Sequence, residues 1–362
     1  MKTIGFMISD QHLIPHGGIG QFCRSFAKMM NNNQYQIVLI TDKKPTKKEF
    51  IKELSYTWNS FPSTPLSYKK HREIYGRFDE GVCYEKISNF QSAIDNAALL
   101  FDFDVIIANS HESLAALADH PIQCKKILYT HLYKQIYPEC KYKSAFLPQY
   151  HTFFQQFLYR DNVTVGTQSD WNKDTLTMLG INNAEVLPMP ITEIDLLTSS
   201  KHVEKSGALY IGRWEEGKNP KDYLKIIKKL NLPAKVMTNK KGKVKFEKAF
   251  AELGITDYDV RAGIIGQEKI DFIKSCKLYL NTSLVECFPN SVIETIAHMP
   301  IVTLDKVKVP WPSNFDGMLH TINMKDLSLV DFLYRASFDD TKTLSYVQGL
   351  HNSVNQLWSN VL

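Results

Sequence analysis

Residues 284–294 read LVECFPNSVIE and hold two glutamates, Glu286 and Glu294, with seven residues between them. An apolar run at Leu278–Leu280 predicts a strand before this stretch, and the apolar positions from Val292 onward predict a helix at its end. The first turn of such a helix directs unpaired backbone N–H groups and the positive end of its dipole at the preceding loop. The stretch therefore predicts an α/β unit with an anion site that has a carboxylate on each side.

Two carboxylates beside a bound diphosphate suit a nucleotide sugar. One can accept hydrogen bonds from the sugar hydroxyls and the other from the ribose hydroxyls. A simpler interpretation stays open for each residue. Ser291 and Glu294 match a capping box, in which the glutamate only closes the first turn of the helix. Glu286 could be a loop residue that faces solvent.

The composition fits an α/β protein of two domains. The chain has 362 residues, and its 44% hydrophobic residues can fill two cores. No apolar run approaches the ~18 residues that indicate a membrane-spanning helix. The first residues, MKTIGFMI, enter a strand pattern without the features of a signal peptide, and the six cysteines show no paired short spacing. We therefore expect a cytoplasmic protein without a disulfide framework or a zinc site.

Short apolar runs alternate with helical patterns, which is typical of a parallel α/β sheet, and the alternation occurs twice. Strands are predicted at Ile4–Ile8, Gln36–Ile40, Asp104–Ile107, Lys126–Tyr129 and Asn162–Val165, then at Ala208–Ile211, Ala234–Met237, Asp259–Ile264, Leu278–Asn281 and Pro300–Leu304. Helices are predicted at Gly20–Met30, Ser113–Ala118, Asp222–Leu230, Phe246–Leu253, Glu268–Ser275, Val292–Ala297 and Leu344–Leu362.

Pro, Ser, Lys and Gly cluster between the two sets of strands, from Met189 to Gly207. We therefore expect two doubly wound, Rossmann-like domains, residues 1–190 and 191–340, followed by a terminal helix within 341–362. Ligands of such sheets bind at the carboxyl ends of the strands, so a cleft between the domains is the expected site.

A glycine-rich turn, PHGGIG at residues 15–20, joins the first predicted strand to a helix. Glycines at such a turn permit a tight backbone and the close approach of a ligand, although a purely structural turn has the same composition. Gly17, Gly18 and Gly20 are therefore candidate ligand-binding residues.

The turn after the strand at Ala208–Ile211 carries two cations, Arg213 and Lys218, five residues apart. Both side chains can reach one diphosphate, the arginine through its planar fork and the lysine as a point charge. The alternative is that both face solvent, as such residues in loops commonly do. Two histidines, His111 and His131, each follow a predicted strand, where residues that line a ligand site gather.

Together these motifs resemble the donor site of retaining glycosyltransferases of the GT-B fold, in the large family-four group. In that family a serine and two glutamates with seven residues between them open the helix that holds the donor diphosphate, and Ser283, Glu286 and Glu294 fall on those positions. The family's Gly-Arg pair and the lysine five residues further on match Arg213 and Lys218.

Two departures from the family pattern stand out. The family usually has a glycine and then a proline after the second glutamate, whereas the segment from Thr295 to Pro300 is one residue shorter and lacks the glycine. The glycine that usually follows the lysine is Asn219 in this chain. The end of the helix after Glu294 must therefore be built differently.

The resemblance implies a GT-B fold, a terminal helix that packs back on the first domain, and transfer of a sugar with retention of configuration. The implied donor is a nucleoside diphosphate sugar, with a UDP-sugar such as UDP-glucose expected. Two cations and a helix start would neutralise its diphosphate, so no metal is expected. The leaving phosphate would take the proton of the acceptor.

The resemblance also assigns residues to roles. The implied catalytic residues are Glu286, His131, Arg213 and Lys218, with Glu286 on the sugar hydroxyls and His131 favoured over His111. The implied donor-binding residues are Gly17, Gly18, Gly20, Arg213, Lys218, Asn290, Ser291, Val292 and Glu294, with Glu294 on the ribose.

The segment Lys43–Arg77 holds nine lysines and arginines against three glutamates, with six interleaved Tyr, Trp and Phe residues. It is either a solvated surface or a surface for a polyanion. The start of the chain is similar to phage enzymes that glycosylate hydroxymethylated cytosine in DNA. We therefore predict 5-hydroxymethylcytosine in double-stranded DNA as the acceptor, bound through this segment. The alternative is a cell-surface or lipid-linked saccharide, with the aromatic segment Tyr142–Tyr159 as a less favoured membrane surface.

Overall fold

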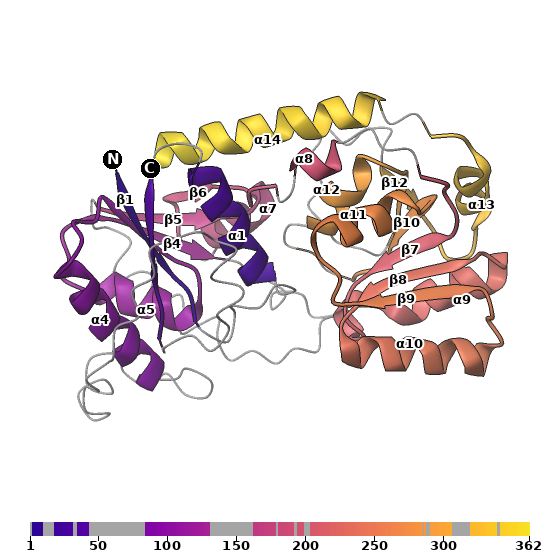
Figure 1. Ribbon diagram of the computed structural model, residues 1–362, viewed down its shortest axis with the longest axis horizontal. Helices are drawn as coiled ribbons and strands as arrows, with labels where there is room; N and C mark the ends of the chain where they lie inside the picture. Colours follow the sequence, from indigo (N-terminus) through magenta and orange to yellow (C-terminus); the bar gives the residue numbers. More distant parts are fainter. Residues whose placement is uncertain are drawn as a thin grey trace. The chain divides into compact units, whose positions relative to one another are not determined.

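The computed structural model describes residues 2–9, 18–31, 35–42, 84–130, 162–178, 180–191, 194–198, 203–284, 286, 290–305, 319–338 and 341–362. The chain divides into two compact units. Unit 1 comprises Met1–Thr192 and Asn355–Leu362, and unit 2 comprises Glu193–Val354. Each unit contains one six-stranded sheet with helices against it (Figure 1).

The sheet of unit 1 is parallel and has the strand order β2-β1-β3-β4-β5-β6. Its strands are β1 (Thr3–Met7), β2 (Gln36–Ile40), β3 (Val105–Ala108), β4 (Lys125–Thr130), β5 (Val163–Thr167) and β6 (Ala184–Val186). Its helices are α1 (Gly18–Asn31), α4 (Tyr84–Ala98), α5 (His111–Asp119), α7 (Asp170–Met178) and the end of α14 (Thr341–Val361).

Both faces of this sheet are covered, which explains why its strands are short, nearly continuous apolar runs. On one face, side chains of α4, α5 and α7 share a buried apolar cluster with the strands. On the other face the cluster is aromatic: Phe22 of α1 stacks on Tyr129 of β4 with ring centroids 4.5 Å apart, and Trp358 of α14 joins them. Gly166 makes room for this cluster, because a Cβ there would lie 2.9 Å from the ring of Tyr129.

The sheet of unit 2 is also parallel, with the order β12-β11-β10-β7-β8-β9. Its strands are β7 (Ala208–Ile211), β8 (Ala234–Thr238), β9 (Tyr258–Ala262), β10 (Leu278–Asn281), β11 (Ile301–Leu304) and β12 (Leu319–Ile322). Its helices are α8 (Ile194–Leu197), α9 (Pro220–Leu230), α10 (Lys240–Leu253), α11 (Gly266–Lys274), α12 (Asn290–Ile296), α13 (Ser328–Arg335) and the first part of α14, with a 3₁₀ turn η3 (Glu216–Lys218).

From the centre of the unit 2 sheet, the chain adds strands towards one edge after β7 and towards the other edge after β10. Helices α9 and α10 lie on one face and α11 and α12 on the other (Figure 1). The chain leaves β7 towards β8 and leaves β10 towards β11, although β7 and β10 are hydrogen-bonded neighbours. The carboxyl ends of these two strands therefore form the switch point of the sheet, where doubly wound folds bind ligands.

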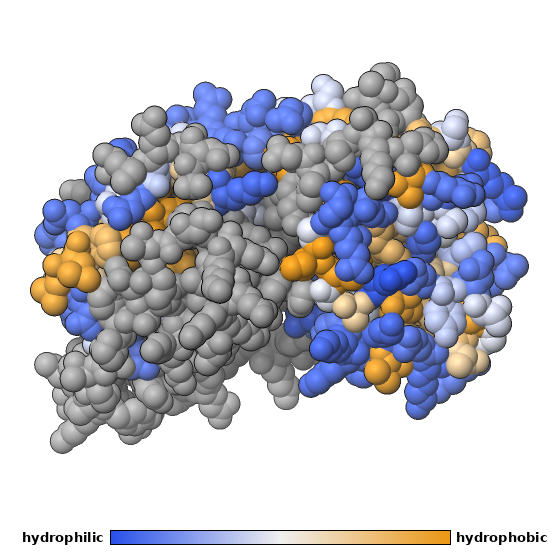
Figure 2. All heavy atoms as spheres, in the orientation of Figure 1, coloured by the Kyte–Doolittle hydropathy of each residue, from blue (hydrophilic) through white to orange (hydrophobic). Residues whose placement is uncertain are grey.

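Apolar residues of unit 2 gather between the sheet and its helices. The largest cluster joins the strands to α9, α10 and α13, with Tyr210, Tyr223 and Phe246 in ring contact at its centre. On the face that Figure 2 shows, the described residues of this unit are mostly hydrophilic. This arrangement is the expected result of alternating apolar strands with amphipathic helices.

The predicted fold class, two doubly wound α/β domains, is confirmed by these sheets. Ten of the twelve strands that the structure describes lie where apolar runs predicted them; the sequence analysis missed the edge strands β6 and β12. Strand β6 has only three residues and β12 reads LHTI, so neither shows a clear run of apolar residues. Helices α4, α7, α8 and α13 were also missed.

Candidate functional site

The candidate site lies where β7 and β10 end side by side in unit 2. The chain after β7 forms the loop 212–219, which contains η3, and the chain after β10 passes through Thr282, Ser283 and Glu286 to α12. Parallel pairing of Leu278 with Ala208 aligns the two strands, so both segments leave the same edge of the sheet. Residues 68 positions apart in the chain thereby become neighbours.

Tyr210 holds the backbone of the loop 212–219 in place through hydrogen bonds from its hydroxyl group. Its hydroxyl lies 3.2 Å from the carbonyl oxygens of both Arg213 and Lys218. The loop closes at Asn219, whose φ of 48° and ψ of 57° place it in the left-handed region. Asparagine tolerates this region better than other residues with a Cβ, which explains how it replaces the glycine of the family pattern.

Hydrogen bonds tie the two segments together. The hydroxyl of Thr282 donates to the carbonyl of Asn219 at 2.9 Å, and the N–H of Leu284 donates to the carbonyl of Gly217 at 2.9 Å. Within the second segment, the N–H of Ser283 donates to the side-chain oxygen of Asn281 at 3.3 Å. The side chains that project from these segments therefore have a fixed backbone beneath them.

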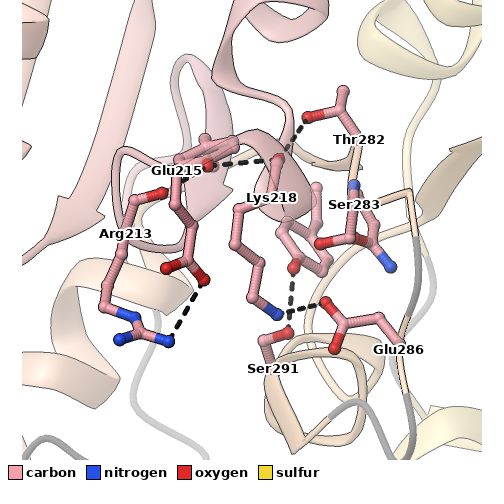
Figure 3. A network of polar contacts seen from close by, with 10 residues as sticks. Arg213, Glu215, Lys218, Thr282, Ser283, Glu286 and Ser291 are labelled. Atoms are coloured by element: carbon pink, nitrogen blue, oxygen red, sulfur yellow. Dashed lines mark hydrogen bonds and ion pairs between the residues drawn. The ribbon is translucent and has the colours of Figure 1, made fainter. Parts of the chain in front are cut away.

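Lys218 and Glu286 form an ion pair across the two segments (Figure 3). The ammonium group contacts Oε1 of the carboxylate, and the two side chains are only 20% and 9% exposed. In an environment so poor in water, a charge pair of this kind attracts more strongly than it would in solvent. The structure thus brings together two of the four residues that the sequence analysis assigned to catalysis.

Arg213 lies on the same loop and its side chain extends in the same general direction as that of Lys218 (Figure 3). Its guanidinium group donates to Glu215 at 3.1 Å, and its side chain is 63% exposed. Arg213 is therefore an accessible cation at the border of the site, whereas Lys218 is an enclosed one.

Glu294 is buried on α12 and pairs with Lys269 of α11, with 2.5 Å between Nζ and Oε1. Helix α12 begins at Asn290, so Ser291 is its second residue and not the residue before it. The hydroxyl of Tyr279 donates to Ser291 at 2.9 Å. The capping-box interpretation therefore fails for Ser291, which lies inside the helix.

Two buried tyrosines complete the site as neutral hydrogen-bond donors. Burial raises the pKa of Tyr279 far above its ordinary value, and the nearby carboxylates of Glu286 and Glu294 raise it further, against the bond to Ser291. Burial raises the pKa of Tyr210 in the same way. Both hydroxyls therefore keep their protons at every physiological pH.

Several buried polar atoms at the carboxyl edges of the sheets have no partner within the described part of the chain. In unit 2 these include Nδ2 of Asn281 and Oγ1 of Thr303, which are opposite each other in the β10–β11 register. In unit 1, Thr130 and Thr167 are opposite each other at the ends of β4 and β5, and Asn172 lies in the first turn of α7. Buried polar groups without partners are uncommon and call for a ligand or an ordered water.

Several predicted residues cannot be compared with this geometry. Gly17 and His131 lie outside the described residues, as do the segments Lys43–Arg77 and Tyr142–Tyr159. Gly18 and Gly20 fall inside α1, which begins at Gly18, two residues earlier than predicted. His111 is the first residue of α5, and only its backbone is described. Val292 is buried in α12, next to Ser291.

Lys269 and Glu215 are site residues that the sequence analysis missed. Lys269 lies in a helix with alternating charges, where a single lysine gives no signal, and only the fold places it beside Glu294. Among the described residues, no group of three or more His, Cys, Asp or Glu could hold a metal ion, and no helix is both long and apolar enough to cross a membrane.

Solved structures with the same architecture include several enzymes that act on sugars. Sucrose-phosphate synthase from Thermosynechococcus elongatus aligns over 100% of this chain and 98% of its own, with a TM-score of 0.74 and 12% identity. Anabaena HepE, solved in complex with UDP and glucose, aligns over 98% of this chain and 95% of its own, with a TM-score of 0.65 and 14% identity.

The lipopolysaccharide outer core galactosyltransferase WaaB aligns over 99% of this chain and 98% of its own, with a TM-score of 0.61 and 14% identity. No protein-family model and no curated protein sequence matches the chain. At these identities the likeness shows the fold, and the predicted GT-B fold is confirmed.

Proposed function

We propose that the protein is a glycosyltransferase that moves a sugar from a nucleoside diphosphate sugar to a hydroxyl group of an acceptor. The observation that carries the proposal is the enclosed Lys218–Glu286 pair at the switch point of the unit 2 sheet. A cation suited to a phosphate and a carboxylate suited to sugar hydroxyls meet there, at the edge where doubly wound sheets bind ligands. The fold that the chain shares with sugar-transferring enzymes supports the same conclusion.

The donor would rearrange this pair. In the proposed complex Lys218 turns from Glu286 to the diphosphate, and the freed carboxylate accepts hydrogen bonds from the sugar hydroxyls. Arg213, exposed on the same loop, adds a second cation to the diphosphate. Asn290, Ser291 and Val292 supply backbone N–H groups at the start of α12. The solved complexes of similar proteins with UDP and with UDP-2-fluoro glucose support a UDP-sugar as the donor.

The proposed reaction retains the configuration of the sugar. The bond between the anomeric carbon and the diphosphate oxygen breaks, and the acceptor oxygen bonds to the same face of that carbon. The acceptor proton passes to the departing phosphate oxygen, so no separate base is needed. Lys218 and Arg213 stabilise the negative charge that develops on the diphosphate, while Glu286 and His131 lie against the sugar. The resemblance supports Gly17, Gly18 and Gly20 as further residues that bind the donor phosphates.

For the acceptor we propose 5-hydroxymethylcytosine in double-stranded DNA, as a phage enzyme in the host cytoplasm would modify it. The support is the sequence of Lys43–Arg77, where cations alternate with aromatic residues that suit phosphates and unstacked bases. An enzyme that glycosylates a base in duplex DNA must first take that base out of the stack. Its binding to DNA should then fall steeply with salt.

A saccharide is the second candidate, and one observation favours it. The buried side chains at the carboxyl edge of the unit 1 sheet that have no partner among the described residues, Thr130, Thr167 and Asn172, are neutral donors and acceptors. Groups of this kind match sugar hydroxyls better than a phosphate backbone. Similar solved proteins include a lipopolysaccharide galactosyltransferase and a sucrose-phosphate synthase.

One assay tests the donor and the acceptor together. The protein is incubated with UDP-glucose and, separately, other nucleotide sugars, and release of the nucleoside diphosphate is followed with each acceptor. The acceptors are duplex DNA with hydroxymethylcytosine, the same duplex without it, and a panel of mono- and oligosaccharides. Transfer only to the hydroxymethylated duplex supports the DNA acceptor, and transfer only to saccharides replaces it with the alternative. No diphosphate release with any donor would contradict the proposed function.

Glu286→Gln separates the role of Glu286 from nucleotide binding. We expect kcat to fall about 10- to 100-fold, because a charged acceptor on the sugar hydroxyls is lost, while the affinity for free UDP stays within about threefold of the wild type. Initial rates and calorimetric UDP binding measure the two effects. An equal loss in both would mean that Glu286 serves the nucleotide.

A further inference from the structure

Helices α9 and α10 form a strongly basic surface of unit 2. Together they hold nine lysines against three acidic residues, a net charge of +6, whereas the whole chain has a net charge of +5. Three of these lysines pair with the acidic residues of their own helices: Lys225, Lys243 and Lys248. The other six are exposed and have no ion pair with a described residue, and we call them the lysine face: Lys221, Lys228, Lys229, Lys240, Lys241 and Lys245.

The two helices lie side by side on one face of the sheet (Figure 1). Tyr223 of α9 and Phe246 of α10 are fully buried with ring centroids 6.3 Å apart, and both rings contact Tyr210 of β7. Both helices therefore turn their inner sides to the same strand. Lys221 and Lys228 are seven residues apart, about two turns, so they share the outer side of α9.

Helix stability does not explain this concentration of charge. The first turn of α10 holds Lys240 and Lys241 but no acidic residue, although the positive end of the helix dipole disfavours cations there. Lys241 and Lys245 are four residues apart, a spacing at which like charges repel. A surface of mixed charges would serve solubility equally well. A bound polyanion accounts for the arrangement, because its charges offset those of the lysines and of the helix start.

The exposed residues decide which polyanion fits. Every exposed residue of α9 is a lysine, and the apolar side of the helix is buried against the sheet, so α9 has nothing to insert into a bilayer. The exposed residues of α9 and α10 include no aromatic ring on which the bases of a single strand could stack. Separate, exposed cations suit the phosphate backbone of a duplex, which is bound without regard to sequence.

The lysine face begins beside the candidate site. Lys221 follows the site residue Lys218 by three positions, and both helices start at the carboxyl edge of the sheet, where the site lies. From there α9 carries lysines over eight residues, about 12 Å, and packed helices are about 8–10 Å apart. A duplex has one phosphate per about 1.7 Å of its axis, so about 12 Å of it carries about seven phosphates. The densities of lysines and phosphates are therefore comparable.

We propose that the lysine face binds the phosphate backbone of double-stranded DNA and holds the duplex beside the candidate site. The surface is separate from the segment Lys43–Arg77 and lies within unit 2. The choice of DNA rests on the acceptor proposed above, whereas the presence of a polyanion surface rests on the charges of α9 and α10.

Fluorescence anisotropy with the full-length protein and an unmodified duplex of about 30 base pairs tests the proposal, at salt concentrations of about 50 to 200 mM. Each lysine that neutralises a phosphate adds about 0.9 to the slope of log K against log salt. Lys241→Gln/Lys245→Gln should therefore reduce the slope by about 2 and the affinity at about 0.1 M salt by about 10- to 100-fold. Adding Lys221→Gln and Lys228→Gln should about double the reduction of the slope.

The double variant Lys243→Gln/Lys248→Gln is the matched control. It removes the same number of lysines from the same helix, but these two lie 3.6 and 3.8 Å from Glu247 and Glu252. The slope should change by less than about 1, because these charges are already partly offset. The reciprocal variant Glu247→Gln/Glu252→Gln frees both lysines and should make the slope steeper. Circular dichroism checks that each variant folds.

Three results would overturn the lysine face: a wild type that does not bind the duplex, a Lys241→Gln/Lys245→Gln protein with the wild-type slope, or equal changes in this variant and its matched control. Tighter binding to the corresponding single strand, or to vesicles that contain phosphatidylserine, would overturn the choice of a duplex.

The outcomes also separate this inference from the proposed function. Duplex binding that depends on the lysine face, without transfer of sugar to hydroxymethylated DNA, would support the surface and contradict the proposed acceptor. Transfer of sugar to saccharides by a protein that does not bind DNA would overturn this inference and leave the proposed glycosyltransferase in place.

Discussion

Lys218→Ala is expected to lower kcat/KM for the nucleotide-sugar donor about 10²- to 10³-fold, the effect typical of removing one preorganised group that stabilises developing charge. The side chain of Lys218 is enclosed, 20% exposed, so water would replace its ammonium group poorly beside a diphosphate. Initial rates over a range of donor concentrations give the ratio. Most of the loss should lie in kcat, because the charge on the diphosphate is greatest as the sugar leaves.

Two variants show whether this effect belongs to Lys218. Arg213→Ala removes a cation from the same loop, but its side chain is 63% exposed and already paired with Glu215, so we expect a smaller loss, about tenfold. Lys225→Ala removes an exposed lysine of α9 and should leave the rate unchanged. A Lys218→Ala protein that folds and keeps wild-type kcat/KM would contradict the placement of the diphosphate.

The Lys218→Ala variant also leaves Glu286 without the counter-charge that the structure gives it. Leaving one member of a buried pair without its partner is destabilising, so some loss of stability is expected as well. Lys218→Met separates the loss of charge from the loss of packing, since it keeps the length of the side chain while it removes the charge. Equal rates for the alanine and methionine variants would assign the kinetic effect to the charge.

The spacing of the motifs predicted which residues follow the two strands at the site, but it did not predict which of these residues contact each other. The glutamates at 286 and 294 and the cations at 213 and 218 could be found because each stands at a fixed offset from an apolar strand. That Lys218 contacts Glu286 depends on β7 and β10 being neighbours in the sheet, although they are separated by β8 and β9 in the chain. Lys269 was missed for the same reason. Helix α11 precedes β10 in the chain, and only the folded structure places it beside α12.

The strands that could be predicted are the apolar ones, which include all central strands and the edge strands β2 and β9 but not the edge strands β6 and β12. Central parallel strands are buried on both faces and must be apolar, so β1, β3, β4, β7 and β10 are visible in the sequence. Edge strands such as β6 and β12 lack a neighbour on one side and can be short and polar. The aromatic cluster that packs against the end of α14 was predictable only in part. Each of its aromatic residues can be recognised in the sequence as apolar, but their contact with one another depends on the fold.

Trp358→Ala should have the largest effect on stability. The tryptophan is fully buried, and its ring meets Phe26 edge-on with centroids 4.9 Å apart and Tyr129 at 5.6 Å. Its indole N–H donates to the carbonyl of Pro188 at 2.9 Å. We expect a loss of about 3–5 kcal/mol in the free energy of unfolding, since a cavity forms and a buried carbonyl loses its donor.

Urea unfolding followed by circular dichroism measures this loss, with the adjacent Leu357→Ala as the matched control. Leu357 is 41% exposed on the same helix, so its replacement should change the free energy by less than about 0.5 kcal/mol. Every ring that Trp358 contacts belongs to unit 1, as does Trp358 itself. If the two units unfold in separate transitions, only that of unit 1 should move to lower urea. Equal effects of the two variants would mean that the end of α14 does not depend on its aromatic anchor, because the exposed and the buried side chain would then contribute alike.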